Sequence, residues 1–226
     1  MSLPSTVVEV ACVQGTPAWL AERVGLLTGS RCAPILAAGK GGAPSAGQET
    51  LLTELVVEAV TGKPVEKSWT PTAAMDAGTE REPLALDRFR VEKQEVLQTS
   101  GFLRHTQLRV GCSLDGHLGD YDELVSIKCR QPKAHYAHLR TNDIPKDARV
   151  QMAHELWVTG AQTHHYVSFN PDFPTALQFH CVTLTRAQLD VDGYAKAALA
   201  FLARLDTEIA AMHTLAAGWQ LAGVSK

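Results

Sequence analysis

Cysteine is scarce in this sequence and follows no pattern. The five cysteines are odd in number and widely scattered, at positions Cys12, Cys32, Cys112, Cys129 and Cys181. This pattern suits reduced thiols in a cytosolic protein better than a disulfide framework or a zinc ribbon.

Long apolar runs are missing as well. No stretch approaches the ~20 residues that a helix needs to cross a bilayer. The first residues, MSLPSTVVEV, do not have the basic-then-apolar layout of a secretion signal. We therefore expect no membrane association and a cytoplasmic location. Of the 226 residues, 45% are hydrophobic and 20% are charged, which predicts one globular domain over residues 1–226.

The chain also lacks an excess of positive charge. Its 21 Lys and Arg residues are outnumbered by 24 Asp and Glu residues, so the formal net charge is −3. Attraction of a polyanion to the whole surface needs clustered Lys and Arg, and is therefore excluded. Any binding of nucleic acid must rest on a local basic site, with the acids elsewhere or around a metal ion.

The order of helical and extended patterns predicts a mixed α/β domain with a central mixed sheet flanked by helices. Residues 16–38 read as two short helices, separated by Gly25 and by a turn whose Thr28 or Ser30 caps the second helix. Further helices are predicted at 49–61, 72–91, 150–160 and 187–217, and strands at 95–105, 107–119, 123–129, 163–171 and 176–185.

The strand ELVSIKC, from Glu123 to Cys129, carries the first candidate for chemistry. Side chains alternate along a strand, so Ser126 and Lys128 share one face, and a hairpin would bring this face beside Asp115. A nuclease strand has an acid and a lysine on either side of one apolar residue, but a serine stands in the acid's position. The pattern by itself also fits an ordinary hairpin with an exposed lysine.

Five stretches in order resemble the lambda-type alkaline exonucleases, the viral recombinase group of the PD-(D/E)xK nucleases. The stretches are AWLAERVGLLTGS, GTERE, CSLDG, SIKC and VQMAHELWVTG. Each is weak alone, but together they extend from Trp19 to about Pro174 with spacing similar to the family's. The resemblance implies a restriction-endonuclease-like core.

The resemblance also implies a metal site. Asp115 matches the family's metal-binding aspartate, although Leu114 stands where the family usually has proline. The carbonyl of Ile127 matches a backbone metal ligand, and Lys128 matches the catalytic lysine. Oxygen ligands suit hard cations, so the expected cofactor is Mg²⁺, with Mn²⁺ as a substitute.

Two further residues match the family's active site, and two depart from it. Glu82 matches a helical acid that borders the metal, and Gln151 matches an active-site glutamine. Ser126 replaces the metal-binding glutamate and is a weak, neutral ligand, while His105 falls near an expected aspartate. A glutamate that was removed and a naturally glutamate-less site are both compatible with the sequence.

Basic and hydroxyl residues match the part of the family that grips the 5′ phosphate of the degraded strand. Arg23 offers a planar fork to phosphate oxygens, and Ser30 adds a hydroxyl. Lys40, in a glycine-rich loop, and Lys133, after the active-site strand, are further candidates for phosphate contact.

The activity that the resemblance implies is the degradation of double-stranded DNA from 5′-phosphorylated ends. Degradation runs 5′ to 3′, releases mononucleotides and leaves a 3′ single strand. The implied partners are two further copies of the chain in a homotrimeric ring and a phage single-strand annealing protein. Two alternatives remain: a catalytically impaired protein that binds DNA ends, favoured by Ser126, and a structure-specific or restriction-type endonuclease, disfavoured by Arg23 and Ser30.

Overall fold

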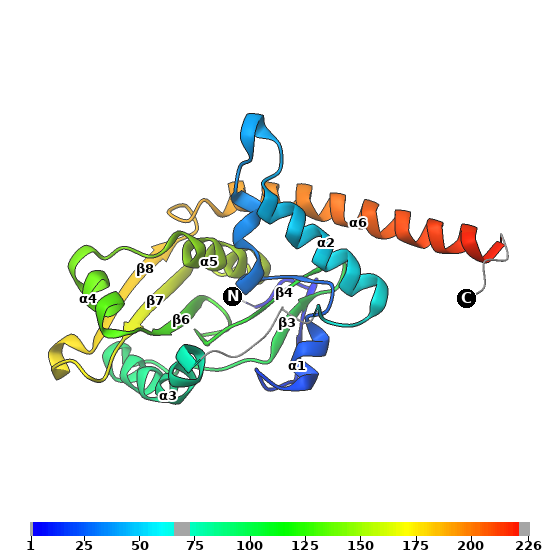
Figure 1. Cartoon of the computed structure of the whole chain (residues 1–226). Helices are drawn as coiled ribbons and strands as arrows, with labels where there is room; N and C mark the ends of the chain where they lie inside the picture. Colours follow the sequence, from blue (N-terminus) through cyan, green and yellow to red (C-terminus); the bar gives the residue numbers. More distant parts are fainter. Residues whose placement is uncertain (1, 66–72, 222–226) are drawn as a thin grey trace.

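Two mixed four-stranded sheets flanked by helices form the core of the protein (Figure 1). The computed structural model describes residues 2–65 and 73–221. The first sheet has the order β1-β3-β4-β2, with β1 (Val7–Val10), β2 (Leu27–Thr28), β3 (Phe102–His105) and β4 (Val110–Ser113). The second has the order β5-β6-β7-β8, with β5 (Gly116–Leu118), β6 (Glu123–Cys129), β7 (Thr163–Phe169) and β8 (Phe179–Thr185).

Six α-helices surround the sheets in the described part of the chain. They are α1 (Pro17–Glu22), α2 (Ala46–Thr61), α3 (Ala73–Lys93), α4 (Pro132–Thr141), α5 (Lys146–Thr159) and α6 (Val191–Leu221). Short 3-10 turns are η1 (Gly29–Arg31), η2 (Ala33–Leu36), η3 (Lys40–Gly42) and η4 (Thr175–Leu177). None of the helices that the structure describes is both long and apolar enough to cross a membrane.

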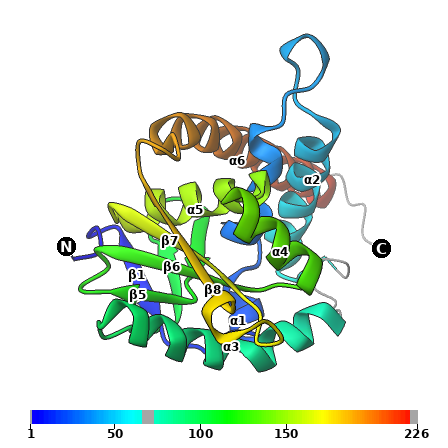
Figure 2. The same ribbon diagram turned by 90° about the vertical axis from the view of Figure 1, so that its left-hand side faces the viewer.

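The second sheet is covered on both faces. Helix α3 lies against one face, where Ala85 and Phe89 share a buried cluster with Val125 and Ile127 of β6. Helix α5 lies against the other face, with α6 beyond it (Figure 2). Because alternate residues of β6 face opposite layers, Ser126 and Lys128 lie on the α5 side.

A larger buried cluster joins both sheets to helices α2, α5 and α6. Helix α2 is preceded by Ser45, whose hydroxyl accepts a hydrogen bond from the Gln48 amide at 3.2 Å, and it is followed by Gly62, with φ 68°. Ser45 therefore binds one of the free N–H groups that begin a helix, and Gly62 takes the left-handed conformation that ends it. The far half of α6 extends beyond the body of the molecule (Figure 1).

The mixed α/β fold flanked by helices is confirmed, and the structure divides the predicted central sheet into two four-stranded sheets. The chain leaves the first sheet after β4 and enters the second at Gly116, so the predicted strand 107–119 is divided at Leu114 and Asp115. The Asp115 carboxylate accepts a hydrogen bond from the backbone amide of Ile127 on β6. In a continuous sheet, a carbonyl of the neighbouring strand would accept this bond. The division therefore coincides with the candidate site.

The second short helix predicted within residues 16–38 is present only as the 3-10 turns η1 and η2, and not as an α-helix. Leu27 and Thr28, just before these turns, pair in parallel with Val110 and Gly111 of β4. Helix α4 was not predicted, because its inward positions include His135 and His138, which interrupt the apolar pattern.

Candidate active site

Asp115 is joined directly to the active-site strand. Its Oδ2 atom accepts a hydrogen bond from the Ile127 backbone amide at 2.7 Å. The hairpin between β5 and β6 creates this contact, since Gly116 pairs with Val125 and places Asp115 beside the next residues of β6. The predicted approach of Asp115 to this strand is confirmed.

The carbonyl of Ile127 points to the same side as Asp115. In a strand, the N–H and C=O of one residue are directed to the same edge. Strand β5 pairs with β6 only from Glu123 to Val125, so this edge of Ile127 lies beyond the paired residues of β5. The oxygens of the Asp115 carboxylate and the Ile127 carbonyl would therefore be able to bind the same cation.

Glu82 and Lys128 complete a centre in which three charged side chains influence one another. Burial raises the pKa of Glu82 to about 7, with a further contribution from the negative charge of Asp115 and opposition from Lys128. Burial likewise raises the pKa of Asp115, while Lys128 and the Ile127 amide act against the rise. We call Glu82, Asp115, Lys128 and the Ile127 carbonyl the acid–lysine centre.

The oxygen donors of the acid–lysine centre fit a hard divalent cation. Both carboxyl groups are held above their ordinary pKa by burial, so a cation between them would favour their ionised forms. Within residues 2–65 and 73–221, no three His, Cys, Asp or Glu side chains gather as a preformed metal site. A cation here would therefore use the backbone carbonyl, water or substrate oxygens besides the acids.

Ser126 is buried on the face that α5 covers, with only 3% of its surface exposed. Its register partner on β7 is Tyr166, and β6 pairs with β7 residue by residue from Glu123 to Cys129. This register confirms that the strand is regular. Glu123 therefore points to the opposite face, where its Oε2 lies 2.5 Å from His165 Nε2.

Gln151 lies on α5 and is tied to a buried acid one turn further along. Its Nε2 donates to Glu155 Oε1 at 2.8 Å, and Glu155 Oε2 lies 2.6 Å from His164 Nε2 on β7. Burial alone would raise the pKa of Glu155, but the hydrogen bond and charge of His164, with Gln151 and Lys128, bring it below its ordinary value. Glu155 is therefore ionised at neutral pH.

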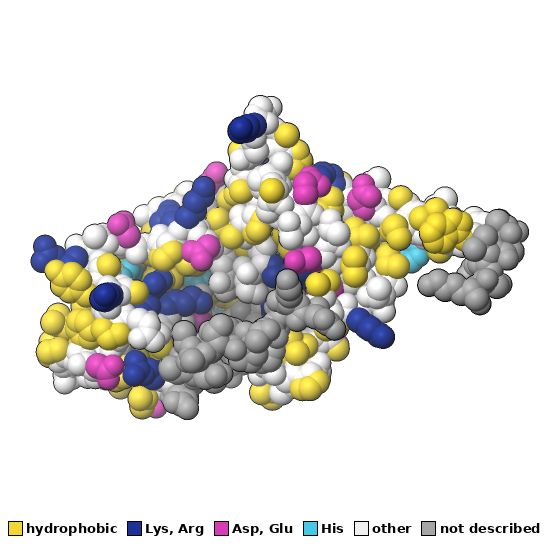
Figure 3. Space-filling model, in the orientation of Figure 1, with side chains coloured by type: hydrophobic (Ala, Val, Ile, Leu, Met, Phe, Trp, Pro, Cys, Tyr) yellow, Lys and Arg dark blue, Asp and Glu magenta, His cyan; other side chains and the backbone are white. Residues whose placement is uncertain are grey.

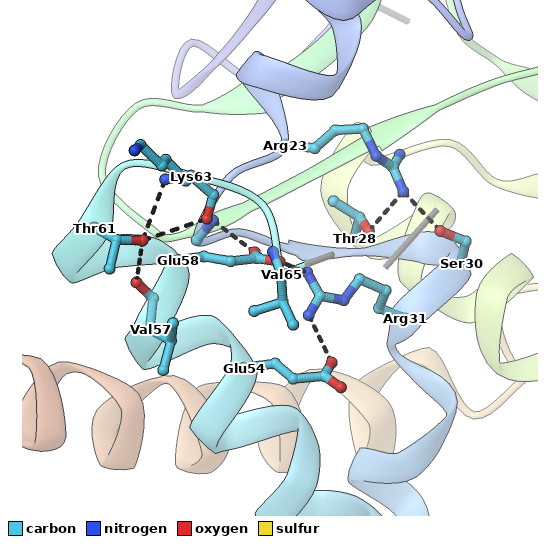
Figure 4. A network of polar contacts seen from close by, with 11 residues as sticks. Arg23, Thr28, Ser30, Arg31, Glu54, Val57, Glu58, Thr61, Lys63 and Val65 are labelled. Atoms are coloured by element: carbon cyan, nitrogen blue, oxygen red, sulfur yellow. Dashed lines mark hydrogen bonds and ion pairs between the residues drawn. The ribbon is translucent and has the colours of Figure 1, made fainter. Parts of the chain in front are cut away.

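Arg23 and Ser30 are brought together as the sequence predicted (Figure 4). Arg23 Nη2 donates to the Ser30 hydroxyl at 2.8 Å and to the Thr28 hydroxyl at 3.2 Å. The guanidinium carbon lies 4.1 Å from the centre of the Trp19 ring. Burial, helped by the charge of Arg31, lowers the pKa of Arg23 to about 10, which leaves it charged at neutral pH. We call Arg23, Thr28 and Ser30 the Arg23 cluster.

A second arginine holds the backbone around the Arg23 cluster (Figure 4). Arg31 Nη1 lies 2.8 Å from Glu58 Oε2, and its Nη2 lies 2.9 Å from Glu54 Oε2. The buried Glu58 also accepts the Gly25 amide at 3.0 Å. These bonds join η1 and the turn at Gly25 to helix α2, so the positions of Arg23 and Ser30 are set by helix α2 as well as by local sequence.

The Arg23 cluster and helix α5 meet at Gly29. A Cβ atom at this glycine would lie 3.2 Å from Glu155 Oε1 and 3.3 Å from Gln151 Cγ, which is closer than an ordinary contact. Glycine therefore allows η1 to approach the Gln151–Glu155 pair. The cluster that includes Ser30 and the helix that carries Gln151 are direct neighbours.

The weaker basic candidates lie on the surface. Lys40 is exposed on η3, in a loop closed by a bridge between Ala38 and Pro44 that projects from the body (Figure 1). Lys133 is exposed at the start of α4. Lys and Arg side chains gather over α4 and α5 on the face in Figure 3. Contact of Lys40 or Lys133 with phosphate stays a prediction.

His105 is the last residue of β3. Its Nδ1 accepts the backbone amides of Gln107 at 3.1 Å and Leu108 at 3.0 Å. The imidazole therefore shapes the turn after β3.

The sequence of the chain matches a known protein family. Residues 18–162 match the YqaJ-like viral recombinase domain, and this range includes every candidate residue named above. The chain is a member of the YqaJ-like viral recombinase family. No curated protein matches the chain.

Solved structures support the same family. The chain is similar to an alkaline exonuclease, LHK-Exo, from Laribacter hongkongensis, with TM-score 0.78 and 29% identity over 90% of this chain and 99% of that one. A structure of LHK-Exo in complex with dAMP matches equally well. A phage-related exonuclease from Haemophilus somnus 129PT, at TM-score 0.63 and 13% identity over 83% of this chain and 96% of that one, shares the fold. The recombinase family and the alkaline-exonuclease fold support a nuclease role.

Sequence reasoning on this YqaJ-like domain missed Glu155 and His164. A signal for Glu155 was present, since it follows Gln151 by four residues and must lie on the same helical face. Nothing local could show that His164 would bind it, because that contact depends on how α5 lies against β7.

Proposed function

We propose that this protein is a Mg²⁺-dependent exonuclease that degrades double-stranded DNA from its 5′ ends, in the 5′-to-3′ direction. It releases mononucleotides and leaves 3′ single-stranded overhangs for annealing in recombination. The observation that carries the proposal is the contact at Gly29 between the Arg23 cluster and the helix of Gln151. The same helix carries Glu155, whose charge acts on Asp115 and Lys128 of the acid–lysine centre. A terminal phosphate bound at the Arg23 cluster would therefore suit cleavage at the next phosphate of the strand.

The Arg23 cluster has the chemistry of a terminal-phosphate site. The nitrogen that binds Thr28 and Ser30 belongs to a guanidinium with five N–H donors, and within residues 2–65 and 73–221 its other N–H groups donate to no protein atom. These donors would bind an anion. An enzyme that cuts inside a strand has no need to hold a terminal phosphate. The dAMP that occupies the LHK-Exo structure supports mononucleotides as the product class.

The acid–lysine centre supplies the chemistry of hydrolysis. A bound Mg²⁺ would polarise the scissile phosphate and lower the pKa of an attacking water. Asp115 and the Ile127 carbonyl would hold the ion, with Glu82 beside them. The Lys128 ammonium would donate to the negative charge that builds up on the phosphate, or to the water. Gln151 would orient the water through its side-chain oxygen.

Basic residues outside the centre support a path for DNA on a chain of net charge −3. Lys133, Arg140 and Lys146 are exposed on α4 and α5. Contacts from such residues to the DNA backbone would position the duplex without reading its sequence. Lys40 would extend the contact if its loop reaches the duplex.

The family supports further assignments. We infer that three copies form a ring around DNA, that the partner is a phage single-strand annealing protein, and that the protein acts in the cytoplasm of a bacterial host of phage or prophage. Exposed apolar side chains on α6, Leu199, Met212, Leu215 and Trp219, supply a surface for contact between copies.

A second candidate function is supported by Ser126. With a hydroxyl in place of a carboxylate, the centre has one negative charge fewer to hold a cation, so the chain could bind DNA ends and degrade them very slowly. One experiment separates the candidates: a 5′-phosphorylated linear duplex and a covalently closed circle of the same sequence, each incubated with Mg²⁺.

An exonuclease degrades the linear duplex and leaves the circle intact. An endonuclease cuts both. An end-binding protein retards the linear duplex in a gel without degrading it. Cutting of the closed circle would overturn the proposed exonuclease, and so would failure to degrade the linear duplex.

A further inference from the structure

The face of the sheet that carries Ser126 is not without an acid. Glu155 of α5 is 1% exposed and reaches β7 from above this face, where its Oε2 lies 2.6 Å from His164 Nε2. His164 pairs in register with Leu124, two residues before Ser126 on the same face of β6. An acid from a different element therefore lies on the face of the sheet that carries Ser126, beside the strand position two residues before it.

The acids next to Ser126 in sequence lie elsewhere. Glu123 points to the α3 side of the sheet and binds His165 there at 2.5 Å. Asp122 precedes the strand, in the reversal where its amide binds the Leu118 carbonyl at 3.2 Å. The uninterrupted pairing of β6 with β7 leaves no bulge through which Glu123 could turn toward Ser126.

We propose that Glu155 is the carboxylate that takes over the part of the acid absent at position 126. The inference rests on the proposed nuclease function and adds a positioning residue to its centre. Glu155 acts in two ways: its charge contributes the negative field that holds a divalent cation beside Asp115, and its Oε1 fixes the side chain of Gln151.

The hydrogen bond to Gln151 has a defined direction. An ionised carboxylate can only accept, so the amide NH₂ of Gln151 must face Glu155. The Gln151 oxygen is then directed elsewhere and is available to a water or a cation. His164 binds the second oxygen of Glu155, which prevents the carboxylate from turning away.

The charge of Glu155 reaches the acid–lysine centre. Its carboxylate and the Lys128 ammonium attract each other, and its charge also acts on Asp115. Gly29 adds a steric condition, because any larger residue there would press on both Glu155 and Gln151. The whole arrangement is assembled from η1, α5, β6 and β7.

A double-mutant cycle between Ser126→Glu and Glu155→Gln tests the inference. The main measurement is Mn²⁺ affinity of the DNA-free protein by isothermal titration calorimetry, and the degradation rate of linear duplex is measured in parallel. Loss of a group that orients a metal site costs about 10- to 100-fold in metal affinity. We expect Glu155→Gln to weaken Mn²⁺ binding by about this factor, and Ser126→Glu to recover most of the loss.

The coupling between the two sites is the decisive quantity. If both acids serve one role, Ser126→Glu should raise Mn²⁺ affinity at least about tenfold more in the Glu155→Gln background than in the parent protein. Glu123→Gln is the matched control, since it removes an acid from the opposite face of β6 and should leave the affinity as in the parent.

Equal effects of Ser126→Glu in both backgrounds would overturn the inference, as would parental Mn²⁺ affinity in Glu155→Gln. Glu155 would then be a structural partner of His164. If Glu155→Gln does not fold, Ser126→Glu alone decides: a gain below about tenfold in the parent supports Glu155, and a gain of about a hundredfold or more contradicts it. If the two substitutions are coupled in Mn²⁺ affinity but no variant degrades DNA, the proposed nuclease function would be wrong and the inference on Glu155 would stand.

Discussion

The guanidinium of Arg23 and the hydroxyl of Ser30 lie 2.8 Å apart, although the two residues are seven positions apart in the chain. The bond is possible because the chain turns back between α1 and η1, and Glu58 holds this turn through the Gly25 amide. Arg23 also lies over the Trp19 ring, which limits its rotation. The charge that would meet a phosphate is therefore held in place before any ligand arrives.

The Arg23 cluster predicts a preference for 5′-phosphorylated ends. Arg23→Ala should remove that preference, because hydrogen bonds to a charged group contribute about 1.5–3 kcal/mol each, or roughly 10- to 100-fold in rate at low substrate. The measurement compares duplexes with a 5′ phosphate and a 5′ hydroxyl. Arg104→Ala, which removes an exposed arginine paired with Glu22, is the control. Equal rates on the two ends for the unmodified protein would contradict the prediction.

We expect Asp115→Asn and Lys128→Met each to lower the degradation rate by about 10²–10³-fold. This is the usual cost of removing one group that stabilises the charge of a transition state. The asparagine oxygen can still accept the Ile127 amide, so the fold should survive. Circular dichroism checks folding and a gel assay of linear duplex gives the rate. A variant that folds and keeps the parental rate would remove its residue from the centre.

We expect the titration of Glu82 to raise the degradation rate and to lower the stability of the fold as the pH rises. Its pKa of about 7 means that it gains charge as the pH rises through neutrality, so degradation at low Mg²⁺ should increase there. The folded state binds this proton more tightly than the unfolded state, whose pKa is near 4.5, so Glu82's contribution to stability falls between about pH 4.5 and 7.

Glu82→Gln should flatten both profiles. The rate is measured against pH at a fixed, low Mg²⁺ concentration, and the free energy of unfolding is measured against pH without divalent cations. Glu92→Gln, on the same helix but outside the centre, is the matched control. Profiles for Glu82→Gln that keep the parental slopes would show that another group titrates.

The ring proposal predicts a solution mass of about 73 kDa, three times the 24.4 kDa chain. If the exposed face of α6 lies between copies, the double variant Met212→Glu and Leu215→Glu should dissociate the ring, because it introduces charges into an apolar contact. Light scattering after gel filtration gives the mass. A monomeric mass for the unmodified protein at micromolar concentration would exclude the ring.

Much of the candidate site was within reach of the sequence because its contacts are local. The alternation of ELVSIKC places Ser126 and Lys128 on one face, and the short reversal before it returns the chain to Asp115. The division of the strands at Asp115 was not predictable from the apolar pattern. A carboxylate that replaces a strand as the partner of Ile127 leaves no mark on hydrophobic periodicity.

Sequence alone determined which side chains bring oxygen, ammonium and guanidinium groups to this protein, and it determined the side of β6 on which Lys128 lies. Tertiary structure decided that Glu155, from another element, covers the face of Ser126, and that Gly29 brings the Arg23 cluster against α5. The physical reason is the sequence distance over which each effect acts. Strand alternation and hairpin reversal act over a few residues, whereas the placement of a helix on a sheet depends on the packing of the whole buried cluster.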